Sequence, residues 1–292
     1  MYDRRERLIQ VFEDTKTFIR EESTLAQKAA EARQATEFYP AEVYPQISAQ
    51  PDKAGAIRVT KHKTFEAAML LHREHKDWRI AVLNFASATT PGGGVTKGSS
   101  AQEESLCRCS TLYPALTSNA LWDAYYSVNR AARNPLYTDA LIYTPNVTIC
   151  KTDDQFPERL EQSDWTEVDV ITCAAPNLRQ RPGNQYNLDQ SALVVVSPEE
   201  LLQLHKSRAR HILTVASSKG VDAIILGAFH IFQALQRLVD RERERPCRWY
   251  AILLRIPDDG MIIPLPADIG ISGTDEVETV IPVQTVLQGN EE

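Results

Sequence analysis

The sequence predicts an α/β fold, a three-layer α/β/α arrangement around a mixed, mostly parallel sheet, preceded by an N-terminal helical extension. Three observations support this prediction. Strand-like apolar runs alternate with amphipathic helical segments through the middle of the 292-residue chain. Residues 80–85 are apolar almost throughout, which is typical of a central strand covered on both faces. A glycine-rich loop follows this run, at the strand end where open α/β sheets place their ligands.

The first 50 residues form the predicted extension. Residues 3–37 contain neither Gly nor Pro, and their apolar side chains recur at helical spacing: Leu8, Val11, Phe12, Phe18 and Ile19. This stripe predicts one long helix or two shorter ones. It is too short for the sustained heptads of an independent coiled coil, so we expect it to pack against the main domain. Three prolines then end the helical pattern: Pro40, Pro45 and Pro51.

The predicted main domain covers residues 51–256. Apolar runs predict strands at residues 56–60, 80–85, 140–144, 168–174, 221–229 and 249–256. Helical patterns predict helices at residues 65–75, 102–116, 119–132, 197–218 and 231–245. The clearest helix start combines a capping Ser197, Pro198 in the first turn and Glu200 three residues after the cap. The tail, residues 257–292, is rich in Pro and acidic residues. We expect it to be partly ordered, with a peripheral strand within residues 277–283.

Composition and charge exclude several classes of protein. The net charge of −7 argues against broad binding to duplex nucleic acid, which needs a basic face. No run reaches the length that spans a membrane, and no signal peptide is recognisable. Five cysteines at irregular spacing favour a reducing compartment, so we expect an intracellular protein, cytoplasmic or, in a eukaryote, nuclear. We also expect a monomer. Cys107 and Cys109 lack the further ligands of a zinc site, so no metal is expected.

The loop after residues 80–85 carries the candidate chemistry. It reads Pro91-Gly92-Gly93-Gly94, and after a seven-residue spacer Gln102-Glu103-Glu104 opens a helical segment. Glycines let a backbone approach a ligand closely, and consecutive N–H groups suit phosphate oxygens. A carboxylate pair beyond such a loop indicates chemistry on a phosphate-bearing substrate. The alternative is a flexible surface turn before a helix whose first turn is acidic, which the helix dipole also favours.

Taken together, these motifs resemble the microbial-type poly(ADP-ribose) glycohydrolases, which carry a macrodomain. The signature of that family is three glycines, a short spacer and Gln-Glu-Glu, which stand here at residues 92–94 and 102–104. Residues 82–88, before the loop, match the family as well. Residues 169–177 resemble its central strand and the turn that follows. The similarity covers roughly residues 4–256, and it implies a macrodomain fold for the main domain.

The resemblance also implies an activity and a set of site residues. The reaction is hydrolysis of the O-glycosidic bond between ADP-ribose units, with ADP-ribose or poly(ADP-ribose) on modified proteins as partner, water as second substrate and no cofactor. Glu104 is then the general acid/base, and Glu103 hydrogen-bonds the ribose hydroxyls. Asn84 is expected at the ribose, and residues 92–94 let the backbone approach the diphosphate. Gln102 either orients the loop or the ligand, or makes a helix-capping contact.

One part of the sequence departs from the family pattern. After Gly227-Ala228-Phe229 the family has a second glycine-rich loop around the diphosphate, whereas here no glycine follows Gly227 until Gly260. We interpret this as a deletion that removes backbone donors to the distal phosphate. Phe229 is a candidate to stack on adenine, or else a core phenylalanine at a strand end. Two hypotheses stay open beside the hydrolase: a macrodomain that binds ADP-ribose without cleaving it, and a scaffold with neither property.

The reaction itself constrains the two glutamates. A transition state that resembles an oxocarbenium ion needs an acid to protonate the leaving oxygen and a base to activate water. Adjacent helix residues point about 100° apart, so Glu103 and Glu104 are expected to have different roles. A helix N-terminus lowers the pKa of a carboxyl, whereas burial and neighbouring negative charge raise it. The pKa of the acid therefore depends on how deeply the pair is buried.

Overall fold

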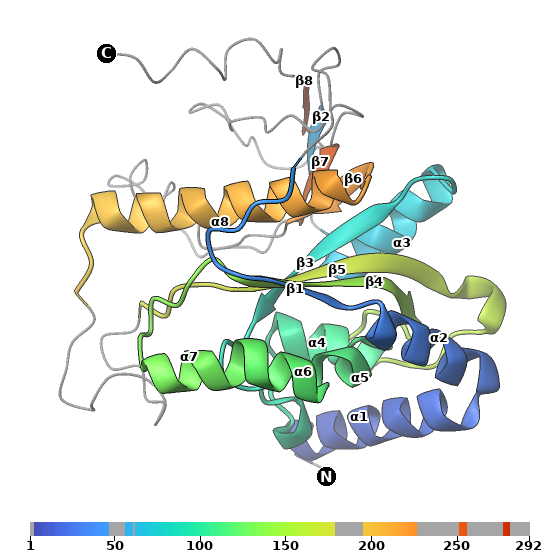
Figure 1. Ribbon diagram of the computed structural model, residues 1–292. Helices are drawn as coiled ribbons and strands as arrows, with labels where there is room; N and C mark the ends of the chain where they lie inside the picture. Colours follow the sequence, from blue (N-terminus) through green and yellow to red (C-terminus); the bar gives the residue numbers. More distant parts are fainter. Residues whose placement is uncertain are drawn as a thin grey trace. The chain divides into compact units, whose positions relative to one another are not determined.

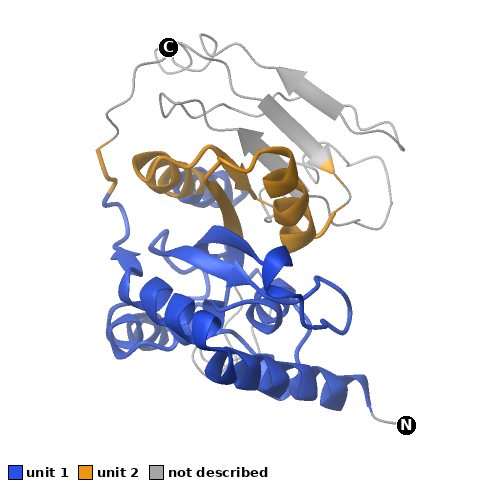
Figure 2. Cartoon of the chain, turned by 90° about the vertical axis from the view of Figure 1, so that its right-hand side faces the viewer, with its two compact units in different colours: residues 1–43, 84–208 blue, residues 44–83, 209–292 orange. Residues whose placement is uncertain are grey.

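The structure, a computed structural model, describes residues 3–46, 56–60, 62–178, 195–226, 251–255 and 277–280 (Figure 1). The chain has two compact units (Figure 2): residues 1–43 with 84–208, and residues 44–83 with 209–292. Strand β3 (Ile80–Ala86) contributes residues to both units. The domain boundaries predicted at residues 50 and 256 stay predictions.

The first unit begins with two helices, α1 (Arg4–Glu21) and α2 (Ser23–Gln34), which is one of the two predicted forms of the N-terminal segment. The chain is extended at Glu22, whose carboxylate accepts a hydrogen bond from the Thr24 N–H at 2.9 Å and so caps α2. The buried residues of α1 follow the predicted stripe: Leu8, Phe12, Thr15 and Ile19. The apolar pattern of the sequence therefore identifies the face that packs.

Three strands of the first unit pair antiparallel. They are β1 (Glu37–Tyr39), β4 (Leu141–Ile149) and β5 (Thr166–Ala174), with β4 between the other two. Strand β1 was not predicted, because a three-residue strand leaves no period in the sequence. The register of β4 and β5 shifts between Thr144 and Val147, where the Asn146 N–H donates to the Asp169 carboxylate at 3.1 Å. Helices α2 and α5 (Leu112–Leu116) pack against β4.

Two predicted helices of the first unit are interrupted. The segment 102–116 forms α4 (Gln102–Cys109) and α5, because Ser110 between them is extended and bridges to Ile149 of β4. The segment 119–132 contains a π-helical turn, η2 (Trp122–Tyr126), between α6 (Asn119–Leu121) and α7 (Ser127–Ala132). Two 3₁₀ turns complete the unit: η1 (Val95–Lys97) and η3 (Gln162–Asp164).

Helix α8 (Pro198–Ser218) starts at the predicted capping box, with reciprocal bonds between Ser197 and Glu200 of 2.9 and 3.1 Å.

The second unit has helix α3 (Thr64–Glu74) and the strand order β3-β6-β7-β2-β8. Its strands match predicted runs: β2 (Ala56–Thr60), β6 (Ala223–Ile225), β7 (Ala251–Arg255) and β8 (Val277–Val280). The β8 strand confirms a peripheral strand in the C-terminal tail. The helix predicted at residues 231–245 lies outside the described residues.

The structure confirms an α/β fold with a mixed sheet flanked by helices, but the prediction that most of the sheet is parallel is wrong. Strands β3 and β6 pair in parallel, whereas β1–β4, β4–β5, β6–β7, β2–β7 and β2–β8 pair antiparallel. Parallel neighbours need a crossover connection, usually a helix. Residues 150–165, between β4 and β5, contain no helix beyond the short turn η3 and so make no crossover, and these two strands pair antiparallel.

Of the helices that the structure describes, none is long and apolar enough to span a membrane.

Candidate active site

The glycine loop and the Gln-Glu-Glu motif are brought together in the first unit. Strand β3 ends at Ala86, and the chain turns through residues 92–94 and η1 before α4 starts at Gln102. Glu103 and Glu104 therefore lie in the first turn of α4, as predicted. Both are buried, with 2% and 7% of their surface exposed. Buried carboxyl groups at a helix start are rare without a functional or hydrogen-bonding reason.

The two carboxyl groups meet at Gly93, although adjacent helix positions diverge. A Cβ on Gly93 would lie 2.5 Å from Glu104 Oε1 and 2.9 Å from Glu103 Oε2. The backbone of Gly93 is left-handed, with φ of +59°. The Gly94 N–H donates to Glu104 Oε1 at 2.8 Å. Glycine is required at position 93 for two reasons: its backbone conformation and the space that both carboxylates occupy.

The other two glycines also have close neighbours. A Cβ on Gly92 would lie 2.6 Å from the ring of Tyr113. A Cβ on Gly94 would collide with the Ser99 side chain. The loop is therefore packed against its surroundings, which the alternative of a flexible surface turn does not predict.

Asn84 and Gln102 tie β3 to the start of α4. The Asn84 amide Nδ2 donates to Thr172 Oγ1 of β5 at 3.1 Å and approaches Glu103 Oε1 at 3.5 Å. Gln102 Oε1 accepts a hydrogen bond from the Phe85 N–H at 2.8 Å. Of the alternatives open for Gln102, this contact favours an orienting role, since the bond joins the helix start to the strand. A contact that capped its own helix would stay within α4.

Burial decides the electrostatics of Glu103. It raises the pKa of Glu103 to about 8, and the charge of Glu104 acts in the same direction. Hydrogen bonds from the Ser87 N–H, at 2.8 Å, and from the Asn84 amide lower the pKa of Glu103 and oppose this rise only in part. At neutral pH Glu103 therefore carries a proton most of the time. The opposing effects that the sequence presents, a helix N-terminus against burial, resolve in favour of burial at this residue.

Several buried polar atoms have no hydrogen-bond partner among the described residues, among them Glu104 Oε2, Asn84 Oδ1 and the Tyr126 hydroxyl. Tyr126 is fully buried in the π-turn η2. Burial, and next the charge of Glu103, raise the pKa of Tyr126 well above its usual value. Native proteins pair nearly all buried polar groups, so these atoms call for a partner beyond the described side chains, either ordered water or a polar ligand. Tyr126 was not among the site residues predicted from the sequence, and it lies in a π-turn, a feature that is frequent at functional sites.

The remaining predicted site residue, Phe229, lies outside the described residues, as does the stretch where the second glycine-rich loop of the family would be. In the part of the chain that is described, no three His, Cys, Asp or Glu side chains group so as to hold a metal ion.

The fold and the site define an α/β protein with a packed glycine loop and a buried glutamate pair at the following helix start. A family model described as "Microbial-type PARG, catalytic domain", in which PARG stands for poly(ADP-ribose) glycohydrolase, matches residues 9–152. The structure is similar to poly(ADP-ribose) glycohydrolase (PARG) from Thermomonospora curvata, with 27% identity, a TM-score of 0.62, and coverage of 81% of this chain and 87% of that one. A second Thermomonospora structure, bound to the inhibitor ADP-HPD, has 26% identity, a TM-score of 0.61 and coverage of 80% and 85%.

PARG from Deinococcus radiodurans in complex with ADP-ribose is 31% identical, with a TM-score of 0.51, over 73% of this chain and 84% of that one. No curated protein matches the chain. The chain belongs to the microbial-type PARG catalytic-domain family, which confirms the resemblance seen in its sequence.

Proposed function

We propose that this protein is a poly(ADP-ribose) glycohydrolase that hydrolyses the ribose–ribose O-glycosidic bond and releases ADP-ribose. The observation that carries the proposal is the convergence of the buried Glu103 and Glu104 carboxyl groups on Gly93. Membership of the PARG family supports it, and so does the Deinococcus relative in complex with ADP-ribose. The substrate is ADP-ribose polymer on modified proteins.

Glu104 is the proposed general acid/base. Its Oε1 is held by the Gly94 N–H, whereas its Oε2 is buried with no partner among the described residues, so the proposal assigns proton exchange with the ligand to Oε2. In the proposed step, Glu104 gives its proton to the leaving ribose oxygen while the C–O bond breaks and an oxocarbenium-like ribose forms. Water then adds to the anomeric carbon and returns a proton to Glu104. The net reaction consumes one water and leaves the enzyme unchanged.

Glu103 is the proposed ribose-holding residue. Its carboxyl is fixed by the Ser87 N–H and the Asn84 amide, which suits orientation better than proton exchange. Because its raised pKa keeps it protonated near pH 7, it can donate a hydrogen bond to a ribose oxygen. A neutral Glu103 also reduces the repulsion between the glutamate pair and the substrate diphosphate.

The other contacts are assigned by the same reasoning. Gly92, Gly93 and Gly94 allow the backbone to approach the diphosphate and the scissile ribose. Asn84 Oδ1 and the Tyr126 hydroxyl, both buried without partners among the described residues, bind sugar hydroxyls. Phe229 remains a candidate to stack on adenine.

The proposed location is intracellular. Four cysteines are free and buried in the structure: Cys107, Cys109, Cys150 and Cys173. Buried free thiols suit a reducing compartment.

A second candidate function is ADP-ribose binding without hydrolysis. It is favoured by the absence of glycine between Gly227 and Gly260, where the family has its second diphosphate loop. Purified protein incubated with an automodified polymerase separates the two, with released ADP-ribose as the readout and calorimetric titration with ADP-ribose in parallel. Release supports hydrolysis. Binding without release supports the second candidate, and the absence of both contradicts each of them.

A further inference from the structure

Helix α1 contacts the segment that runs from the glycine loop to the end of α4, through residues that the proposed chemistry does not use. The first contact is at its N-terminal turn. Arg5 Nε donates to the Lys97 carbonyl oxygen, at the end of η1, at 2.6 Å. The next residue, Gly98, has a φ of +70°, and a Cβ there would collide with the Arg5 carbonyl oxygen. The loop therefore lies directly against the α1 backbone at this point.

The second contact passes through an aromatic pair. Phe12, fully buried on α1, packs edge-on against the ring of Tyr113, with centroids 4.9 Å apart at 84°. The same Tyr113 ring fills the space in front of Gly92. Phe12 thus supports the side chain against which the first glycine of the loop rests.

The third contact reaches the end of α4. The buried Thr15 hydroxyl is 2.6 Å from the Arg108 carbonyl oxygen and 2.9 Å from the Val11 carbonyl oxygen. Arg108 in turn donates from Nη1 to the Ser99 carbonyl oxygen at 2.7 Å, and the Ser99 side chain lies against Gly94. One chain of contacts therefore runs from Thr15 to the glycine whose N–H holds Glu104.

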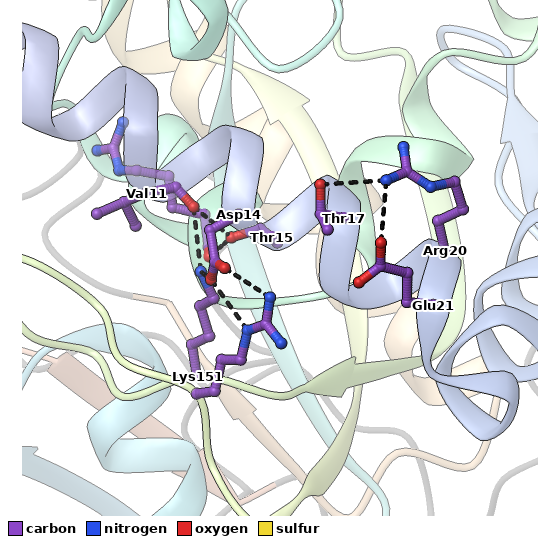
Figure 3. A network of polar contacts seen from close by, with 9 residues as sticks. Val11, Asp14, Thr15, Thr17, Arg20, Glu21 and Lys151 are labelled. Atoms are coloured by element: carbon purple, nitrogen blue, oxygen red, sulfur yellow. Dashed lines mark hydrogen bonds and ion pairs between the residues drawn. The ribbon is translucent and has the colours of Figure 1, made fainter.

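Helix α1 is itself anchored at a separate place. Lys151, with 1% of its side chain exposed, donates from Nζ to the Val11 carbonyl at 3.0 Å and pairs with Asp14 at 2.6 Å (Figure 3). Arg159 holds the same Asp14 carboxylate with two hydrogen bonds of 2.6 and 3.2 Å, and this bonding lowers the pKa of Asp14. A buried ammonium without a carboxylate is strongly unfavourable, so this anchor fixes the middle of α1.

From these contacts we infer that α1 is a positioning element of the catalytic site. Arg5 holds the loop at Lys97, Phe12 supports it at Gly92 through Tyr113, and Thr15 holds the end of α4 at Arg108. Together they keep the segment 92–108 in its productive geometry. Glycine loses more conformational freedom on ordering than any other residue, so a loop with three consecutive glycines needs external support. Small displacements of catalytic groups lower rates steeply. The catalytic part of this inference rests on the proposed glycohydrolase function, whereas its structural part concerns the free protein.

The test compares two arginines of α1 that are both exposed. Arg5→Ala removes a bond to the loop, whereas Arg20→Ala removes only bonds to Thr17 and Glu21 within the helix (Figure 3). Thr15→Val is a third variant, which keeps the side-chain shape without the hydroxyl. Hydrogen exchange of residues 92–99 is measured in the free protein, together with the thermal midpoint, kcat and KM.

We expect Arg5→Ala and Thr15→Val to speed exchange of residues 92–99 about fivefold and to lower kcat more than they change KM, since each loses about one hydrogen bond to the segment. Arg5→Lys, which can still donate to the Lys97 carbonyl, should restore most of both. Unchanged exchange in Arg5→Ala relative to Arg20→Ala overturns the inference, even if Thr15→Val fails to fold. Faster exchange in a protein whose wild type releases no ADP-ribose would instead sink the proposed function and leave the positioning role in place.

Discussion

The Gly94 N–H donates a 2.8 Å hydrogen bond to Glu104 Oε1, so the glycine loop directly holds one of the two carboxylates that follow it in the sequence. This bond leaves the other oxygen, Oε2, buried without a partner among the described residues. The glycine loop and the glutamate pair are therefore directly coupled. Changes in the loop should act on the carboxylates as well as on ligand contacts.

Gly93→Ala tests this coupling. A methyl group at Gly93 would lie 2.5 Å from Glu104 Oε1 and 2.9 Å from Glu103 Oε2, in a left-handed backbone. We expect a loss of about 1–2 kcal/mol in the free energy of unfolding from the backbone alone, and in addition a loss of ADP-ribose binding because both carboxylates are displaced. Denaturant unfolding and calorimetry measure the two effects.

Gly220→Ala is the matched control for that change. Gly220 has a φ of +67°, and a Cβ there meets no atom of the described residues within 4 Å. It should show a similar backbone cost of about 1–2 kcal/mol, with ADP-ribose binding intact. Equal binding by the two variants would contradict the placement of the carboxylates around Gly93.

Glu103→Gln should change how stability depends on pH. The folded pKa of Glu103, about 8, lies above the value of 4.5 for an unperturbed glutamate, so between these two pH values the folded state holds a proton that the unfolded state has lost. This group therefore lowers the free energy of unfolding as pH rises through that window, by up to about 1.4 kcal/mol per pH unit. A glutamine has no proton to lose, so the variant should gain stability relative to wild type as pH rises.

Urea unfolding at intervals from pH 5 to pH 9 provides the measurement, with the exposed Glu161→Gln as control. A difference between Glu103→Gln and wild type that does not vary with pH would show that Glu103 is already ionised in the folded protein.

Tyr126→Phe should separate stability from binding. The hydroxyl is buried without a partner among the described residues, so removing it should leave the free protein equally stable or stabilise it by about 1 kcal/mol. If a sugar hydroxyl is its partner, the same change should weaken ADP-ribose binding about fivefold. The thermal midpoint and a calorimetric titration report the two quantities.

The matched control is Tyr143→Phe, because the buried Tyr143 hydroxyl donates to Asp169. That variant should lose stability, since a buried carboxylate loses a donor. A Tyr126→Phe variant that is destabilised in the same way, with unchanged ADP-ribose affinity, would give the hydroxyl a structural role.

The sequence predicts the parts of this site well and its contacts poorly. The apolar run before Gly92 and the acidic helix start at Glu103 are local patterns, and both stand where they were predicted. The meeting of two adjacent glutamates at Gly93 depends on how the loop returns to the helix, which no helical period encodes. The partners of Gln102 and Asn84 lie on strands, so they follow from the tertiary arrangement alone.

The fold shows the same division. The stripe on α1 identifies its buried face, because amphipathic spacing is a local property. The dominance of antiparallel pairing was missed, since strand direction depends on whether a connection crosses over rather than on strand composition. The π-turn that buries Tyr126 was missed for a related reason: it is a one-turn departure within an otherwise helical pattern.

The most direct test of the proposed function compares wild type with Glu104→Gln in release of ADP-ribose from poly(ADP-ribose) on an automodified polymerase, with calorimetric ADP-ribose binding measured on both. Glutamine keeps an oxygen that can accept the Gly94 hydrogen bond but carries no exchangeable acid proton. We predict release by the wild type, a fall of about 100-fold or more in the variant, and similar ADP-ribose affinity in both. Full release by the variant, or none by the wild type, would contradict the assignment of Glu104 as the general acid/base of a glycohydrolase.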